Sequence, residues 1–312
     1  MYRSCLTPGR MADRMRVLGI GDNVCDMYIH KGMMYPGGQA LNVAVYAHML
    51  GVESAYLGVF GTDEVAAHVQ RTLTGLNIPF PRCRTYPGEN GYALVTLTDG
   101  DRVFLGSNRG GVLQGHYLEL NEDDWVYLSR FSVIHTTNNA FFDHGLPTLR
   151  GTGALVSYDF STRWTERDRV ERTAPYIDVA FLSCGGLTAE EIEAVCRDLV
   201  SRGIGTVCAT CGSQGAAACA GRRMIWQPAK LVQAVDTMGA GDSFAAAVMV
   251  ELGRAAEHDG RMCWQDPAWR EAVLPGALEQ AAAFSARICL LEGAFGHGIA
   301  IPETIKGRVM PR

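Results

Sequence analysis

Short apolar runs alternate with amphipathic stretches along most of the chain. Runs of the length and composition of buried strands fall at 16–20, 54–59, 133–136, 155–159, 179–183 and 206–210. Hydrophobic residues at helical spacing fall at 39–50, 64–73 and 188–202. This alternation of strands and helices is typical of βαβ units. It predicts an α/β fold of three layers, with a mostly parallel central sheet and helices on both faces.

Two regions, 26–36 and 91–105, depart from this rhythm. They contain short alternating segments joined by Lys31-Gly32 and Asp99-Gly100, which are typical of antiparallel hairpins. We expect them to form a small separate sheet. Such a sheet has open edges and one apolar face, so it is expected to cover a bound substrate or a partner subunit as a lid.

The chain has 312 residues of which 47% are hydrophobic, enough for one large core. We predict a single domain over 15–312. Residues 1–14 are polar and basic and lack the apolar centre of a signal peptide, so we expect a disordered extension and a cytoplasmic protein. The stretch 257–274, with Trp264 and Trp269 among charged residues, is predicted to be a surface insertion between C-terminal helices.

Charge and cysteine content narrow the class of partner. The formal net charge is −5 and there is no long Lys or Arg run, which argues against a nucleic-acid or membrane surface and favours a small molecule. The ten cysteines are scattered through apolar segments. Only Cys208 and Cys211 have redox or metal spacing, and no second pair accompanies them. We therefore expect reduced, buried cysteines.

The segment 236–242, Asp-Thr-Met-Gly-Ala-Gly-Asp, leads into an Ala-rich stretch predicted to be a helix over 243–252 that ends at Gly253. A small-residue turn before a helix directs unpaired N–H groups and the positive end of the helix dipole at one point, which favours an anion. Asp242 beside that point could accept a proton from an attacking hydroxyl. The alternative is a plain helix cap. The backbone of the expected anion hole comes from Gly239, Ala240, Gly241 and Asp242.

This string resembles the C-terminal signature of ribokinase-type, or PfkB-type, carbohydrate kinases. Gly37-Gly38 followed by Asn42 resembles the N-terminal sugar signature of the same family. The resemblance implies that the paired glycines let the chain approach a sugar, and that Asn42 and Asp26 hydrogen-bond its hydroxyls. It also implies the ribokinase-like fold, in which the small sheet is the lid.

The segment 210–215, Thr-Cys-Gly-Ser-Gln-Gly, resembles the nucleotide loop of the family. The resemblance places Thr210, Gly212 and Gly215 near ATP and gives Thr237 a role beside phosphate or cation. ATP and Mg²⁺ are the implied cofactors, and a monovalent cation is left open. The family often carries Asn-x-x-Glu where this chain has Ser183-Cys184-Gly185-Gly186. The ligands of the metal therefore stay unassigned.

Within the family the chain is most similar to bacterial fructoselysine 6-kinases. The stretches that carry this similarity are 21–28, 42–46, 101–104 and 159–164. The implied acceptor is the 6-hydroxyl of a fructosamine, and Arg102 is expected to contact its sugar hydroxyls or its carboxylate. Asp22 and Glu89 are candidates for receiving a lysine ammonium. A homodimer through the lid is also expected.

Other functions stay open at this point. Fructose, 2-keto-3-deoxygluconate or a nucleoside could replace the fructosamine as acceptor. Gly19-Ile20-Gly21 could be a dinucleotide loop, although Val24 stands where the third glycine belongs. A sugar-binding regulator without turnover is a further alternative, against which the carboxylate of Asp242 argues.

Overall fold

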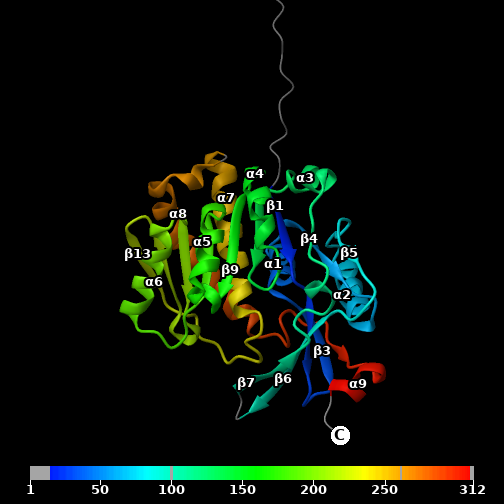
Figure 1. The fold of residues 1–312 in the computed structure, drawn as a ribbon. Helices are drawn as coiled ribbons and strands as arrows, with labels where there is room; N and C mark the ends of the chain where they lie inside the picture. The colour runs from blue at the N-terminus through cyan, green and yellow to red at the C-terminus, as the bar shows by residue number, and fades with distance from the viewer. Residues whose placement is uncertain (1–14, 99–100, 261, 310–312) are drawn as a thin grey trace, which may run out of the picture.

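A computed structural model describes residues 15–98, 101–260 and 262–309, with side chains for all of these except 97, 98, 101 and 102. It contains a large sheet covered by helices and a small sheet beside its lower edge (Figure 1). The expected extension at 1–14 lies outside the described residues, and the single-domain boundaries stay a prediction. Within the described residues, no helix is both long and apolar enough to cross a bilayer.

The large sheet has nine strands in the order β13-β12-β11-β10-β9-β8-β1-β4-β5. All neighbours from β5 to β11 pair in parallel, and β12 and β13 form an antiparallel extension at one edge. The predicted mostly parallel sheet is therefore confirmed. Its strands are β1 (Arg16–Gly21), β4 (Glu53–Phe60), β5 (Arg84–Thr85), β8 (Val133–Thr137), β9 (Leu155–Ser161), β10 (Val179–Ser183), β11 (Thr206–Thr210), β12 (Ala216–Ala220) and β13 (Arg223–Gln227).

Alternate residues of each central strand enter two hydrophobic clusters, one on each face of the sheet. On β10, Phe181 belongs to one cluster and Leu182 to the other. Because both faces are buried, these strands are continuous apolar runs rather than alternating ones. One cluster takes residues of α1 (Gln39–Met49), α2 (Glu64–Gly75), α7 (Ala240–Asp259) and α8 (Pro267–Ile288). The other takes residues of α3 (Glu122–Leu128), α4 (Leu146–Gly151), α5 (Arg167–Thr173) and α6 (Ala189–Ser201).

The small sheet has five strands in the order β14-β3-β2-β6-β7. Both predicted hairpins are present, β2 with β3 and β6 with β7, but the two hairpins join through a parallel pairing of β2 with β6. The strands are β2 (Val24–Tyr28), β3 (Met33–Gly37), β6 (Gly91–Thr98), β7 (Asp101–Ser107) and β14 (Ile299–Ala300). Helix α9 (Glu303–Val309) lies beside this sheet (Figure 1).

Two sequence predictions for the C-terminal helices are wrong. Helix α7 does not end at Gly253 but continues to Asp259. A Cβ at Gly253 would lie 2.3 Å from the Met15 sulfur and 3.0 Å from Val133. This glycine therefore serves the close packing of α7 on the sheet rather than its termination.

The stretch 257–274 is not a surface insertion. It holds the end of α7, one short 3₁₀ turn at Cys263–Gln265 and the first turns of α8. Trp264 and Leu274 are buried, and both belong to the cluster that α7 and α8 form with the sheet. Of the charged residues that suggested an excursion, Glu257, Asp259 and Asp266 are exposed on this helical corner.

Candidate active site

Gly239 shapes the turn before helix α7. Its φ is 72°, in the left-handed region, and a Cβ there would lie 2.1 Å from the Tyr46 hydroxyl oxygen. Both facts require glycine at this position. The turn therefore lies directly against helix α1, which carries Tyr46.

Asp236 holds the other end of the same turn. Its carboxylate accepts hydrogen bonds from the N–H groups of Met238 (2.9 Å) and Gly293 (3.0 Å) and from the Tyr28 hydroxyl (2.5 Å). Tyr28 belongs to strand β2 of the small sheet. Asp236 is thus a structural clamp of the turn, and it ties the turn to the small sheet.

The start of helix α7 carries no side-chain cap in the described part of the chain. The Ala240 N–H donates to the Thr237 carbonyl (3.2 Å) and the Ser243 N–H to the Gly239 carbonyl (2.8 Å). The N–H groups of Gly241 and Asp242, which lie between them, have no acceptor within the helix by geometry. Ala240 and Gly241 line a pocket. Backbone donors and the positive end of a 20-residue helix therefore meet at that pocket, as the sequence predicts for an anion site.

Asp242 lies in the first turn of α7 and is half-buried. Its Oδ2 accepts a hydrogen bond of 2.6 Å from the Asn42 side-chain amide. Burial raises the pKa of Asp242 to about 6, the negative charge of Asp22 adds to the rise, and the Asn42 hydrogen bond opposes it. A carboxyl group with this pKa is ionised at neutral pH and is basic enough to accept a proton.

The sugar signature meets this carboxylate. A Cβ on Gly37 would lie 2.8 Å from the Asp26 carboxylate and 3.7 Å from the Asn42 amide oxygen. A Cβ on Gly38, whose φ is 112°, would lie 2.8 Å from Asn23 Cα. The structure thus brings Asp26, Gly37, Gly38 and Asn42 together as the sequence predicts. The Asn42 oxygen is buried and, among the described residues, has no hydrogen-bond donor, which suits a ligand hydroxyl.

Asp22, a candidate from the sequence for receiving a lysine ammonium, is buried beside the site. Asp22 accepts hydrogen bonds from the Gln39 N–H (2.8 Å), the Ala40 N–H (3.2 Å) and the Thr137 hydroxyl (2.8 Å). It therefore caps helix α1 from the connection between β1 and β2, which makes it unsuited to receiving a lysine ammonium. Glu89, the other candidate, pairs with Arg308.

Asp159 lies near the end of strand β9 and is buried. It accepts hydrogen bonds from the Gln39 amide (3.1 Å) and the Ser161 N–H (2.6 Å). Burial and then the charge of Asp242 raise the pKa of Asp159 to about 7. A carboxylate directly at the end of a predicted parallel strand is the sequence signal that could have identified it.

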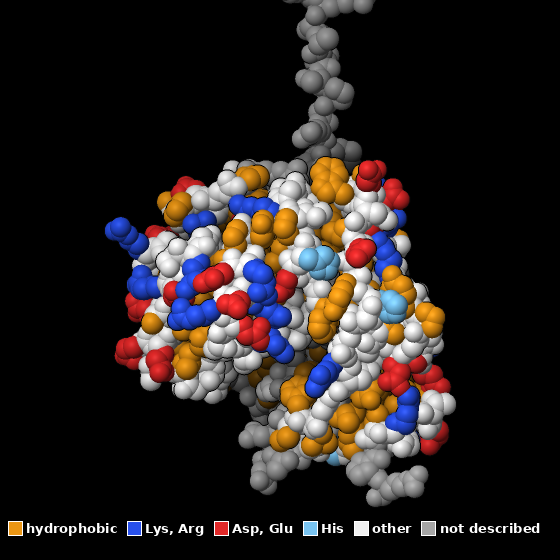
Figure 2. Space-filling model, viewed as in Figure 1, with side chains coloured by type: hydrophobic (Ala, Val, Ile, Leu, Met, Phe, Trp, Pro, Cys, Tyr) orange, Lys and Arg blue, Asp and Glu red, His pale blue; other side chains and the backbone are white. Residues whose placement is uncertain are grey.

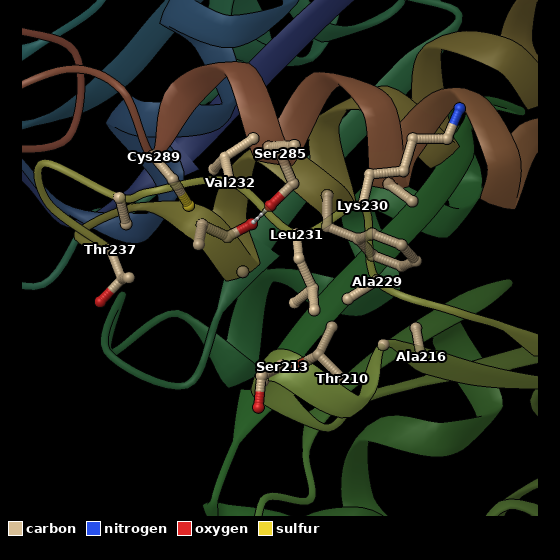
Figure 3. A pocket seen from close by; sticks show the side chains of 18 of the residues that line it. Thr210, Ser213, Ala216, Ala229, Lys230, Leu231, Val232, Thr237, Ser285 and Cys289 are labelled. Atoms are coloured by element: carbon tan, nitrogen blue, oxygen red, sulfur yellow. Dashed lines mark hydrogen bonds between the residues drawn. The ribbon is translucent and has the colours of Figure 1, made fainter.

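The pocket at the start of α7 has a volume of about 420 Å³ (Figure 3). The predicted nucleotide residues Thr210, Gly212, Gly215 and Thr237 all line it. Gly215 has φ 104°, and a Cβ there would lie 2.2 Å from the Gln227 carbonyl oxygen, so the loop after β11 requires glycine. Strand ends, the loop and the helix start thus form one wall of a pocket adjoining Asp242.

The cysteine pair does not form a site. Cys208 and Cys211 are buried in the clusters on opposite faces of the sheet, and burial raises the pKa of Cys208 to about 12. Their thiols are therefore poor nucleophiles and poor ligands.

Within the described residues, no three His, Cys, Asp or Glu side chains are grouped to hold a metal. Ser183 and Gly186 occupy the loop after β10, at the positions of the Asn and Glu that the family often carries. No metal ligand is assigned there.

The predicted contact of Arg102 with substrate lies outside the described side chains. Strand β7, which carries Arg102, is the outer edge of the small sheet. The role of this residue therefore stays a prediction.

A three-layer α/β fold with a small second sheet, and a pocket where a strand end of the large sheet meets a helix start, is typical of ribokinase-like kinases. The sequence profile described as "pfkB family carbohydrate kinase" matches residues 13–286. The chain therefore belongs to the pfkB family of carbohydrate kinases.

Similar proteins agree with this assignment. The chain is 39% identical to fructosamine kinase FrlD of Bacillus subtilis over 285 residues, covering 91% of this chain and 94% of the relative. It is 30% identical to fructoselysine 6-kinase of Escherichia coli over 277 residues, covering 88% and 98%. The structure of a Xylella fastidiosa fructokinase with bound ATP has the same fold, with a TM-score of 0.72 at 21% identity, covering 90% and 94%.

Proposed function

We propose that this kinase transfers the γ-phosphoryl group of ATP to the primary 6-hydroxyl of a fructosamine such as fructoselysine, with Asp242 as general base. One observation carries the proposal. The hydrogen bond from Asn42 to Asp242 joins the sugar signature to the helix start that lines the 420 Å³ pocket. A hydroxyl held by Asn42 and Asp26 would lie beside the carboxylate and face the pocket.

The reaction then follows from the groups present. Asp242 accepts the proton of the attacking hydroxyl, a new bond forms between that oxygen and the γ-phosphorus, and the bond to ADP breaks. Amides of the turn formed by Gly239, Ala240, Gly241 and Asp242 stabilise the charge of the transferred group. We propose that Mg²⁺ comes with the ATP phosphates and neutralises their charge. A monovalent cation stays an open expectation.

The nucleotide side of the proposal rests on the pocket lining. Thr210 is the last residue of strand β11, Gly212 lies just after it, and Thr237 lies in the turn before α7. All three line one cavity. This is the crevice at the carboxyl ends of parallel strands where α/β proteins bind nucleotides. ATP placed there has its phosphates toward the helix start.

The fructosamine acceptor is supported by the relatives. Two that cover at least 88% of the chain carry the names fructosamine kinase and fructoselysine 6-kinase. Fructose, 2-keto-3-deoxygluconate and nucleosides would use the same base and anion hole and are the alternative acceptors. We also propose a cytoplasmic location, where ATP and free sugars meet.

The test is ADP formation by purified protein with ATP, Mg²⁺ and one acceptor at a time. We expect turnover with fructoselysine at a higher kcat/KM than with fructose, 2-keto-3-deoxygluconate or a nucleoside. ADP release that does not depend on any acceptor would contradict the proposal. Preference for a simple sugar would move the assignment to that sugar.

The fall of kcat/KM at low pH, the acid limb of the pH profile, should reflect protonation of Asp242. A general base works only when it is ionised, so kcat/KM should fall as the pH is lowered through about 6, the pKa of this carboxyl. Measuring kcat/KM over about pH 5–8 would show the limb. The pKa of Asp159 is about 7, so this carboxyl is mostly protonated at the pH where Asp242 titrates, and Asp159→Asn should leave the acid limb in place. An acid limb that moves to lower pH in this variant would show that Asp159 is ionised beside Asp242.

A homodimer through the small sheet is a further proposal. Strand β7 is the outer strand, and its Phe104 and Leu105 are 60% and 56% exposed. Figure 2 shows hydrophobic side chains gathered over the small sheet. Phe104→Glu would place a charge in such an interface, so we expect a dimer for the unaltered chain and a monomer for the variant in analytical ultracentrifugation. A monomer in both cases would remove the proposal.

A further inference from the structure

A second pocket, of about 740 Å³, lies between helix α5 and the segment that follows strand β8. None of its lining residues belongs to the nucleotide pocket. Figure 2 shows Lys and Arg side chains alternating with Asp and Glu over α5 and α6, with hydrophobic side chains next to them. The lining that matters here is Tyr117, Phe141, Asp143, Arg169, Glu171 and Arg172.

A chain of hydrogen bonds connects the lining of the second pocket with the sugar site. Arg169, from its lining, donates to the Asn138 carbonyl (3.2 Å). The next side chain, Asn139, donates to the Gln39 side-chain oxygen (2.8 Å), and Gln39 in turn bonds Asp159 in the active site. Phe141 follows two residues later, at most about 7 Å along the chain. The 138–141 loop thus runs from the sugar site to the lining of the second pocket.

Phe141 has an unusual conformation. Its φ is 52°, in the left-handed region that bulky side chains avoid, and the ring is 41% exposed. It lies near the ring of Tyr117, at 6.2 Å between centroids, and Tyr117 is also exposed. A strained backbone that presents an aromatic ring to solvent indicates a contact with a ligand. Two such rings offer a surface for a chain of methylene groups.

The charged side chains of the pocket differ in whether they already form ion pairs within the protein. Arg169 is already paired with Asp143 (3.4 Å) and Glu166 (3.2 Å). Arg172 is exposed and forms no ion pair with any of the described residues. Its neighbour Glu171 approaches Arg202 at 3.3 Å on the surface, where such pairs are weak. The guanidinium of Arg172 and the carboxylate of Glu171 could therefore pair with the two opposite charges of a zwitterionic ligand.

We propose that this second pocket binds the amino-acid part of the fructosamine, with Arg172 receiving its carboxylate and Glu171 its α-ammonium group. The rings of Phe141 and Tyr117 cover the methylene chain between these groups and the sugar nitrogen. The inference rests on the proposed fructosamine function and adds its specificity site. The substrate class is then a fructosamine linked through the side-chain nitrogen of a basic amino acid.

The experiment compares two substrates in three proteins. The substrates are fructoselysine linked through the side-chain nitrogen and the fructosamine of pentylamine, which lacks the carboxylate and the α-ammonium. In Arg172→Gln, the ratio of kcat/KM for the first substrate over the second should fall about tenfold, because a charged hydrogen bond is lost. The loss should appear in KM rather than in kcat.

The matched control is Arg167→Gln, on the same helix and exposed but outside this pocket. Its ratio should equal that of the unaltered chain. If Arg172→Gln keeps the same ratio as the control while fructosamines are turned over, the subsite is wrong and the proposed function stands. If the unaltered chain turns over simple sugars and no fructosamine, both are wrong.

Discussion

The Asp242→Asn protein is expected to turn over about 10²–10⁴-fold more slowly than the unaltered chain while still binding ATP. Asparagine has the same shape and keeps a hydrogen-bond acceptor at the first turn of helix α7, so the turn and the pocket persist. What it removes is a carboxylate whose pKa of about 6 lets it take a proton at neutral pH. Initial rates of ADP formation and ATP titration calorimetry would separate the two effects.

Asp266→Asn provides the control for Asp242→Asn. Asp266 caps helix α8, accepting a hydrogen bond from the Ala268 N–H (2.9 Å), and lies outside both pockets. An aspartate that only caps a helix should tolerate asparagine with little change in rate. If the two variants behave alike, Asp242 is a cap and the base lies elsewhere.

Asn42→Asp should lower kcat/KM on the order of a hundredfold at pH 7. In the structure the Asn42 amide donates to Asp242 at 2.6 Å and lowers the pKa of that carboxyl. A second carboxyl in the same place would accept instead of donating, and the two negative charges would repel in a buried site. The pKa of Asp242 would rise, and less of the base would be ionised.

The readout for Asn42→Asp is the pH profile. The acid limb should move to higher pH, so part of the activity should return in alkaline buffer. Asn42→Ala loses the hydrogen bond without adding a charge, and its limb should lie between those of the unaltered chain and Asn42→Asp. A limb in Asn42→Asp no higher than in Asn42→Ala would show that repulsion is not the cause of the loss.

The central sheet could be predicted because its strands are buried on both faces. Runs such as 179–183 and 206–210 are apolar at their centres, and the structure has strands with these bounds. Helix ends were less certain. Gly253 resembles a glycine that ends a helix. In the structure a side chain there would instead clash with Met15 and Val133, which are distant along the chain. Local sequence cannot reveal such a contact.

The site was partly accessible from the sequence for a similar reason. The 236–242 turn and the sugar signature are local motifs. They could be recognised from the sequence without knowing that the fold brings them into contact. Burial in the folded chain raises the pKa of Asp22, and burial together with the charge of Asp242 raises the pKa of Asp159. Neither environment exists before the strand ends come together. The second pocket depends on the unusual φ of Phe141 and on the approach of α5, neither of which is written in any short motif.

Helix α1 sits on strand β1 with almost no space between them, since a Cβ on Gly19 would lie 2.1 Å from the Ala40 carbonyl oxygen. The residues proposed to hold the reacting end of the substrate therefore lie on two tightly packed elements. The proposed amine subsite, by contrast, uses exposed side chains such as Phe141 and Arg172, whose replacement disturbs little packing. Evolution could exchange one amine for another there, leaving the phosphoryl-transfer machinery as inherited.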